Sequence, residues 1–444
     1  MRRSHISTLI ALAAAFALTG AGCSLLNRAP ATPAPVTLEW WRASADAGDA
    51  VALAPVIAAY RVVHPNVTVH VRSIRPDEYR DMLTTALAED RGPDIISLPN
   101  TWIRGWKPRL APQPETLPNR LTVRQTINDY LEVAATDILL PGDTGQQQLW
   151  GLPFSADTLV LFANADLMAK AKVAVPPATW YELREVAKGM TVTDSATGKV
   201  TQSGAALGTS QNIRYAADIM AAIMAQNGAQ FDSFNADSGA TFGQTQAVQG
   251  SRVQPAADAL AFYRSFADPD SGYRTWDASQ PDSLEAFATG RTAFYIGYPT
   301  DAAALTARAP KLNFTLNALP LIYPEKTTHL AGYPIEAVTR KSAHQAQAWD
   351  LLLFAAKAEN VRAYLDATHR PTALRALIAA QSTDPAIAPF ANQALTALTW
   401  YRGRDATQAE DVFLTMIEAP PKDPTRPDWQ SMVSAAQNQI NKNY

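Results

Sequence analysis

The side chains that most often carry out chemistry are sparse in this sequence and form no catalytic pattern. No His-Glu-x-x-His motif, no Gly-x-Ser-x-Gly motif and no common phosphate-binding loop occurs. We therefore predict no metal and no cofactor. A pair of carboxylates that cleaves a glycoside has no local signature, so a carbohydrate-active enzyme stays open as an alternative. The histidines beyond the leader are scattered: His64, His70, His329, His344 and His369.

Cys23, the one cysteine of the chain, indicates a different chemistry. It follows a basic start, an uncharged Ala-rich run and four small residues, the order of an export signal. The run is shorter than the ~20 apolar residues of a spanning helix. The position resembles a bacterial lipobox, although Gly20 stands where leucine is usual; the alternative is an ordinary cleaved signal with an incidental cysteine. We predict a signal peptide at 1–22 and a lipidated Cys23 that begins a flexible tether at 23–35.

The composition bounds the possible partners of the mature chain. The sequence has 444 residues, of which 47% are hydrophobic, and its formal net charge is −3. A chain of this length buries a large core and favours two domains over one. Since no basic block occurs, nucleic acid is excluded as a partner. We expect a monomer.

Strand and helix patterns alternate along the first part of the chain. A strand ending near Trp41 precedes a helical stripe, an alternating strand starts at Val67, and Asp94 to Leu98 is typical of a buried parallel strand. Asp77 is expected to cap the second helix, and Pro55 fits the first only if that helix begins near it or bends. This βαβαβ order predicts a parallel, right-handed sheet.

A second cycle of elements begins near residue 150. Leu159 to Ala163 is another buried strand, and Thr179 with Glu182 matches a capping box at the start of a helix. Ala216 to Gln226 is expected to be a helix closed by an Asn-Gly pair. From Ser342 onward the pattern is almost entirely helical.

Seven short motifs follow one another in a characteristic order: Trp40–Trp41, His64–Val69, Gly92–Ile96, Trp150–Pro153, Leu159–Asn164, Pro177–Leu183 and Gly290–Phe294. Together they resemble family 1 extracellular solute-binding proteins, the maltose-binding-protein-like receptors of ABC importers. Most of these motifs mark the fold rather than the ligand, so they indicate the family better than the substrate.

The resemblance implies an α/β, two-lobed periplasmic-binding-protein fold of the class II type. A ligand cleft lies between the lobes of such proteins, and the C-terminal part is helical. The implied division is an N-lobe at 36–151, a C-lobe with its crossing segment at 152–329, a return to the N-lobe at 330–356 and C-lobe helices at 357–444.

The same resemblance implies ligand contacts in loops at strand ends and in the crossing segments. Aromatic faces stack on sugar C–H groups, while carboxylates and amides bind hydroxyls. Asp157 is either a cleft carboxylate or a hinge residue that pairs with an arginine, and Arg42 is either a ligand clamp or a solvated charge. The candidate residues are Trp41, Arg42, Asn100, Thr101, Trp102, Asp157, Gln211, Asn212, Tyr298, Tyr333 and Trp400.

These expectations together predict an exported, lipid-anchored receptor on the cell envelope, facing the periplasm or the exterior. It captures a small polar solute, a mono- or oligosaccharide, by hinge closure and hands it to ABC permease subunits; it is not an enzyme. The alternatives are a secreted carbohydrate-active enzyme and a structural surface lipoprotein without a ligand. A polyamine, a phosphorylated glycerol derivative or a metal chelate are alternative solutes.

Overall fold

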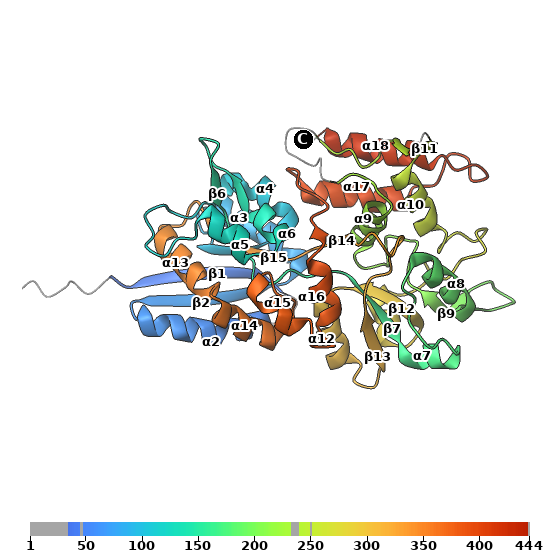
Figure 1. Ribbon diagram of the computed structural model, residues 1–444, viewed down its shortest axis with the longest axis horizontal. Coiled ribbons are helices and arrows are strands. Elements are labelled where there is room, and N and C mark those ends of the chain that lie inside the picture. Colours follow the sequence, from blue (N-terminus) through green and yellow to red (C-terminus); the bar gives the residue numbers. More distant parts are fainter. Residues whose placement is uncertain (1–33, 45–47, 232–238, 249–250, 443–444) are drawn as a thin grey trace, which may run out of the picture.

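Two bodies, each built around its own sheet, lie side by side along the longest axis of the molecule (Figure 1). Each body has its own apolar core, and this confirms the two-lobed α/β fold that the sequence predicts. The predicted signal peptide, Cys23 and most of the tether lie outside the described residues. The computed structural model describes residues 34–44, 48–231, 239–248 and 251–442.

The N-lobe sheet has five strands in the order β2-β1-β3-β15-β4. Val36 of β1 lies opposite Val67 of β2, and Trp40 of β1 lies opposite Ile95 of β3, all in parallel register, as the βαβαβ pattern predicts. β15 runs antiparallel to β3 because the chain returns to this sheet from the C-lobe. The strand bounds are β1 Val36–Ala43, β2 Val67–Ile74, β3 Ile95–Pro99, β4 Leu110–Ala111 and β15 Pro334–Thr339.

Helix α2 (Gly48–Val63) covers this sheet and contains Pro55 in its interior. A proline removes the hydrogen bond to the carbonyl four residues earlier, here that of Val51. Val51 is exposed, so water reaches this first part of the helix. The other N-lobe elements are α3 Pro76–Ala88, η1 Asn100–Trp102, α4 Ile103–Trp106, η2 Lys107–Arg109, α5 Val123–Asp129, α6 Glu132–Ile138, β5 Leu139–Pro141, β6 Gln147–Leu149, α13 Gln345–Ala355, α14 Ala358–Thr368 and α15 Arg375–Gln381.

The C-lobe sheet has the order β13-β7-β12-β9-β8, with β12 parallel to β9 and antiparallel to β7. The helix predicted at 216–226 is α9, with the same bounds. The elements of this half and of the junction are β7 Val160–Asn164, α7 Ala165–Lys170, α8 Trp180–Met190, β8 Val192–Thr193, β9 Val200–Ala205, α9 Ala216–Gln226, β10 Gln246–Val248, β11 Ser251–Val253, α10 Pro255–Arg264, α11 Ser283–Ala288, β12 Thr292–Gly297, α12 Pro299–Arg308, β13 Phe314–Asn317, β14 His329–Leu330, α16 Ala388–Ala394, β16 Ala397–Leu398, α17 Ala406–Glu418 and α18 Trp429–Asn441.

The two predicted helix caps have different outcomes. The capping box is confirmed, because Thr179 Oγ1 accepts from the Glu182 backbone N–H and the Glu182 carboxylate accepts from the Thr179 N–H. The prediction for Asp77 is wrong, since the N-cap of α3 is Arg75 and Asp77 lies in the first turn. A carboxylate there still interacts favourably with the positive end of the helix.

Three chain segments connect the lobes, and they pair with one another. The first, 152–158, forms bridges with the returning chain at Leu152–Glu336 and Thr158–Ala331. It also forms the bridge Ser155–Thr372 with a third segment after α14, near residue 370, that the sequence does not predict. The lobes are therefore joined by a small three-stranded hinge.

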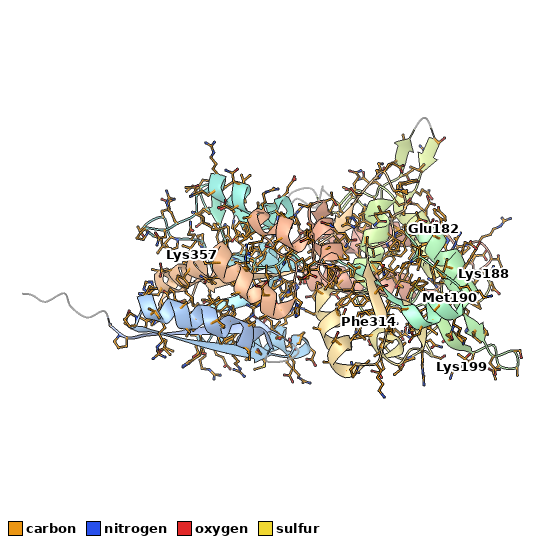
Figure 2. The ribbon with its side chains drawn as sticks, turned by 60° about the horizontal axis from the view of Figure 1, so that its bottom comes forward. Glu182, Lys188, Met190, Lys199, Phe314 and Lys357 are labelled. Atoms are coloured by element: carbon orange, nitrogen blue, oxygen red, sulfur yellow. The ribbon has the colours of Figure 1, made fainter. Side chains whose placement is uncertain are left out.

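The third segment exists because α14 belongs to the N-lobe. α14 packs against α2, and its Val361 and Tyr364 are part of the N-lobe core. Lys357 lies over the N-lobe in Figure 2, whereas Glu182 and Phe314 lie on the other body. The sequence assigns 357–444 to the C-lobe. Within that range α17 and α18 pack into the C-lobe core, and Phe390 of α16 packs with Val160 and Phe162 of the C-lobe sheet, but α14 belongs to the N-lobe.

Candidate ligand-binding site between the lobes

A buried network of charged side chains connects the hinge segments. Arg42, near the end of β1, lies 3.0 Å from Glu336 Oε1 of β15 and donates to Tyr364 Oη at 2.9 Å. Arg370 also donates to Tyr364 Oη, and its Nε lies 3.0 Å from Asp157 Oδ2. Within the described residues, two cations and two carboxylates thus contact one another inside the protein, and pairing of this kind lowers the cost of burying charge.

This network decides where two candidate residues lie. Of the two alternatives for Asp157, a cleft carboxylate or a hinge residue that pairs with an arginine, the structure shows the second, because Asp157 pairs with Arg370. Arg42 is neither a solvated charge nor part of a wetted surface, because its side chain is 1% exposed and held by Glu336 and Tyr364. Both side chains therefore serve the hinge in this conformation.

A second polar cluster surrounds Asp137 of α6, next to the hinge. Its carboxylate accepts from Tyr333 Oη at 2.7 Å, from Thr399 Oγ1 at 2.5 Å and from Arg402 Nε at 3.0 Å. Asn100 donates to it as well, at 3.2 Å, from the end of β3. Burial, with the adjacent Asp137 charge, raises the pKa of Tyr333, so its hydroxyl stays protonated and donates. Two predicted residues, Asn100 and Tyr333, thus meet on one carboxylate.

A third cluster forms the corresponding wall of the C-lobe. Asp218 of α9 accepts from Trp400 Nε1 at 2.8 Å and from Tyr298 Oη at 3.0 Å. Desolvation raises the pKa of Asp218. The ring of Tyr215 packs edge-on against Tyr298 at 4.8 Å. Two further predicted residues, Tyr298 and Trp400, thus share one carboxylate.

The hinge contacts the C-lobe cluster through Gly332. A Cβ atom at this position would lie 2.6 Å from Tyr298 Oη, which is shorter than the non-bonded contacts that Cβ atoms make in proteins. The Gly332 N–H donates to the Asp157 carbonyl at 3.0 Å, and Tyr333 follows directly in the chain. The clusters around Asp137 and Asp218 therefore flank the same short stretch of the crossing chain.

Glu410 of α17 lies beside the Asp218 cluster. Its side chain is exposed, yet desolvation is the largest cause that raises its pKa to about 7, followed by the charges of Asp218 and Asp411. The C-lobe wall therefore presents two carboxylates next to aromatic rings.

The N-lobe side of the gap carries stacked indole rings. Trp102, a candidate residue, stacks on Trp106 at 5.8 Å, and the guanidinium of Arg80 lies 5.8 Å from its ring centre. A small interlobe cavity adjoins these rings, with Asp405 from the C-lobe on its far side. Thr101 lies between Asn100 and Trp102 in the same turn and is half-buried.

The remaining candidate residues do not meet these clusters. The Trp41 ring, 9% exposed, lies under the guanidinium of Arg72 at 4.9 Å. Asn212 ties its own loop together, donating to the carbonyls of Asp277 and Gln280. Gln211 is exposed.

Sequence reasoning missed Asp137, Asp218 and Glu410. A usable signal exists for Asp218, because it is a lone carboxylate within a helix whose other side chains are almost all apolar. A charge in such a helix needs partners, which marks it for attention. Asp137 and Glu410 carry no comparable signal.

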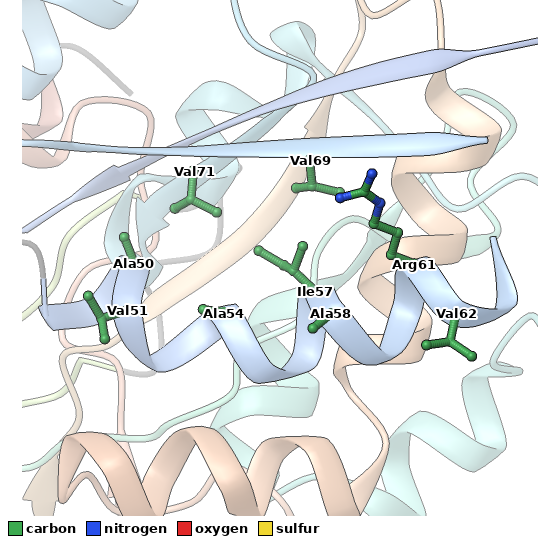
Figure 3. A pocket seen from close by; sticks show the side chains of 9 residues that line it. All are labelled: Ala50, Val51, Ala54, Ile57, Ala58, Arg61, Val62, Val69 and Val71. Carbon is green, nitrogen blue, oxygen red and sulfur yellow. The ribbon is translucent and has the colours of Figure 1, made fainter. Parts of the chain in front are cut away.

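A larger cavity, about 630 Å³, lies on the outer side of the N-lobe, between α2 and the edge strand β2. Figure 3 shows Ile57 and Arg61 of α2 facing Val69 of β2. Its lining is mostly alanine, valine and isoleucine, with Arg61 as the single charge. This lining therefore lacks the set of polar side chains that would bind a polar ligand.

Two features are absent from the described part of the chain. Among those residues, no helix is both long and apolar enough to cross a membrane. Within the same residues, no three side chains of His, Cys, Asp or Glu stand together as a metal site.

The sequence matches known proteins. A sequence model of the family described as bacterial extracellular solute-binding protein matches residues 56–392. An uncharacterized lipoprotein in the oleD 5′ region of Streptomyces antibioticus is 31% identical over 182 residues, which are 38% of this chain and 36% of that protein. The chain thus matches about a third of the length of this relative.

Solved structures share the fold across nearly the whole chain. An ABC transporter solute-binding protein from Thermotoga lettingae, bound with α-D-tagatose, has a TM-score of 0.68 at 19% identity, covering 91% of this chain and 99% of that one. The GacH receptor of Streptomyces glaucescens, solved unliganded and with acarbose, has a TM-score of 0.69 at 18% identity, covering 93% of this chain and 100% of that one. A cyclic α-maltosyl-1,6-maltose binding protein from Arthrobacter globiformis has a TM-score of 0.70 at 19% identity, covering 92% of this chain and 98% of that one. At these identities the likeness shows the fold.

Proposed function

Because the chain belongs to the family of bacterial extracellular solute-binding proteins, we propose that it is an exported receptor. It captures a mono- or oligosaccharide between its two lobes and delivers it to the permease subunits of an ABC-type importer. One observation carries this proposal: the clusters around Asp137 and Asp218, each a carboxylate with aromatic partners, flank the same crossing segment. The solved relatives bound to tagatose, acarbose and malto-oligosaccharides favour a sugar.

The C-lobe wall has the chemistry to bind a hydroxylated ligand. An ionised carboxylate has about four acceptor positions. Asp218 uses two of them for Tyr298 and Trp400, and Glu410 is exposed. Sugar hydroxyls can donate to the remaining positions, while the partly exposed edges of the stacked rings of Trp102 and Trp106 on the opposite lobe offer an apolar surface. Each lobe supplies only part of this contact set.

Hinge closure follows from that division. A ligand that touches both lobes binds the closed arrangement better than the open one, and so shifts the population towards closure. The paired strands of the hinge bend while both lobe cores stay intact. Comparing small-angle X-ray scattering with and without sugar tests this step, and an unchanged radius of gyration at saturating sugar contradicts it.

A thermal-shift panel of mono- and oligosaccharides tests the function itself. A sugar that binds only the folded protein raises its melting temperature. For that sugar, measured at a pH above the Glu410 pKa of about 7 so that the carboxylate is ionised, Glu410→Gln should weaken binding about tenfold, because hydrogen bonds to charged groups contribute ~1.5–3 kcal/mol. Glu185→Gln is the matched control, since Glu185 is another exposed helical carboxylate, on α8. If no sugar raises the melting temperature, or if both variants bind equally well, the proposal fails.

We place the membrane anchor at Cys23, on the small residues and apolar run that precede it. The lipoprotein named among the relatives supports this placement. Stable anchoring needs more than one acyl chain, which a diacylated cysteine supplies. Cys23→Ser should abolish incorporation of a labelled fatty acid and release the protein from the membrane fraction. Retention of the label in the variant would refute the anchor at Cys23.

A further inference from the structure

A cavity of about 230 Å³ separates α3 and α4 of the N-lobe from the start of α17 on the C-lobe. Three arginines line it, Arg80 and Arg109 from the N-lobe and Arg404 from the C-lobe, against a single carboxylate, Asp405. The positive charges therefore come from both sides of the gap and meet in one space.

The single carboxylate leaves most of this positive charge uncompensated. Arg80 Nη2 is 4.0 Å from Asp405 Oδ1, a loose pair, and the same carboxylate oxygen also accepts from the Gln408 N–H as the cap of α17. Within the described part of the chain, neither Arg109 nor Arg404 has a carboxylate at salt-bridge distance. An anion that enters the cavity would lie among residues that carry three positive charges and one negative charge.

Indole rings hold two of these arginines in place. The Arg80 guanidinium lies 5.8 Å from the Trp102 ring centre, and that of Arg109 lies 5.3 Å from the Trp106 ring centre. The two rings are themselves stacked. A guanidinium over an aromatic face keeps its N–H edge available, and that edge matches carboxylate, sulfate and phosphate oxygens.

Gly105 brings the two lobes together beside the cavity. A Cβ atom at Gly105 would lie 2.0 Å from the carbonyl oxygen of Arg404, so the backbones of the two lobes touch here. Any other residue would hold the lobes apart and move Arg404 away from Arg80 and Arg109. The arginine set is therefore complete only when the lobes are close.

We propose that this cavity binds the anionic group, a carboxylate, sulfate or phosphate, of a charged sugar. The proposal rests on the proposed function and narrows its ligand class. Ordinary small-molecule pockets measure ~300–1,000 Å³, so this space suits one charged group and the atoms that carry it, not a whole ligand.

The rest of the ligand has a place next to the cavity. Ala406 and Thr407 of α17 line the cavity, and Glu410 lies one turn further on the same helix face. One turn of helix is about 5 Å, comparable to a sugar ring. An anionic group among the arginines therefore leaves the hydroxyls of the same molecule beside Glu410, which accepts from them.

The experiment compares matched ligands in a buffer free of phosphate and sulfate. Galacturonate and its oligomers are paired with galactose and its oligomers, glucose 6-phosphate is paired with glucose, and inorganic phosphate serves as the bare probe. Binding is followed by calorimetry for the wild type and for Arg80→Gln, Arg109→Gln, Arg404→Gln and Gly105→Val. Arg91→Gln is the control, because Arg91 is exposed on the N-lobe and its one ion pair among the described residues is with its neighbour Glu89.

We expect the charged member of a pair to bind at least tenfold more tightly, with the advantage shrinking as salt is raised. Each arginine substitution should remove about tenfold of affinity for the charged sugar and change that for a neutral sugar less than twofold. If phosphate binds and the arginine substitutions weaken its binding, the anion site is supported even when no sugar binds. The absence of binding by every sugar would, however, reject the proposed function. Neutral sugars that bind as tightly as charged ones, or variants that weaken both equally, overturn the inference and leave the sugar receptor standing.

Discussion

Replacing Asp157 by asparagine should destabilise the protein without removing a ligand contact. The side chains of Asp157 and Arg370 are 4% and 7% exposed, and Arg370 contacts both carboxylate oxygens. The asparagine side chain would keep the shape but remove the negative charge that contacts the buried guanidinium through both carboxylate oxygens. Breaking a buried pair from one side typically costs about 3–5 kcal/mol. Since Tyr364 still accepts from Arg370, we expect about 3 kcal/mol, the lower end of that range.

Urea unfolding followed by tryptophan fluorescence measures this loss. Arg370→Gln should cost a similar amount, and the double variant less than the sum, because neither charge is then left alone. Glu285→Gln is the control, since the Glu285–Arg308 pair is exposed and should contribute less than about 1 kcal/mol. If Asp157→Asn left the unfolding midpoint unchanged but abolished sugar binding, Asp157 would be a ligand carboxylate and the hinge reasoning would be refuted.

Three further predictions concern single positions. Burial lowers the pKa of His329 from 6.5 to about 4, so the folded state resists protonation. The free energy of unfolding should therefore fall by up to about 1.4 kcal/mol per pH unit as the pH drops from 6.5 towards 4. His329→Leu should reduce this pH dependence when urea unfolding is measured at several pH values over that range. Gly332→Ala should cost about 1–3 kcal/mol by the clash with Tyr298 Oη, and Tyr298→Phe, which removes that oxygen, should recover part of the loss in the same urea assay. Thr179→Ala should lower the free energy of unfolding by about 1 kcal/mol through loss of the capping box; equal midpoints for variant and wild type in a thermal melt would contradict it.

The elements that the sequence predicts well are those whose signal is local. The parallel strands at the start of the chain follow from alternation and apolar runs, and the Thr179 cap follows from a spacing of three residues. The Asp77 cap is wrong because acidic residues are favoured both at the cap and in the first turn, so composition alone does not separate the two positions. The sequence therefore predicts that a helix or strand exists better than it predicts the residues at which that element begins and ends.

The assignment of the C-terminal helices needed information that is not local. A helical pattern states that a face is apolar but not which core receives it. α14 packs against α2, some 300 residues earlier in the chain, whereas α17 and α18 reach the C-lobe. The third hinge segment near residue 370 follows from this packing, so the sequence could not indicate it.

The same limit explains the candidate site. The sequence places Asn100 and Tyr298 at strand ends, Tyr333 at the return to the N-lobe and Trp400 between C-terminal helices, and the structure gathers them in two pairs. The sequence does not show which carboxylate joins each pair: Asp137 resembles any surface charge, and the apolar helix around Asp218 indicates that this charge needs partners but not which ones. Contacts of this kind arise only when separate elements pack, and a sequence pattern does not encode them.

The hinge network also constrains how the lobes can move. Glu336 lies on the returning strand, while Asp157 and Arg370 belong to the other two crossing segments, and Tyr364 links both arginines. Opening the network would expose or isolate a buried charge, at a cost of several kcal/mol that a weakly bound sugar does not supply. Closure must therefore rotate the lobes about this network and leave its ion pairs intact. In such a rotation the space between the lobes narrows most far from the hinge. Gly105 and Arg404 form a backbone contact between the lobes, and a contact of this kind would stop the rotation.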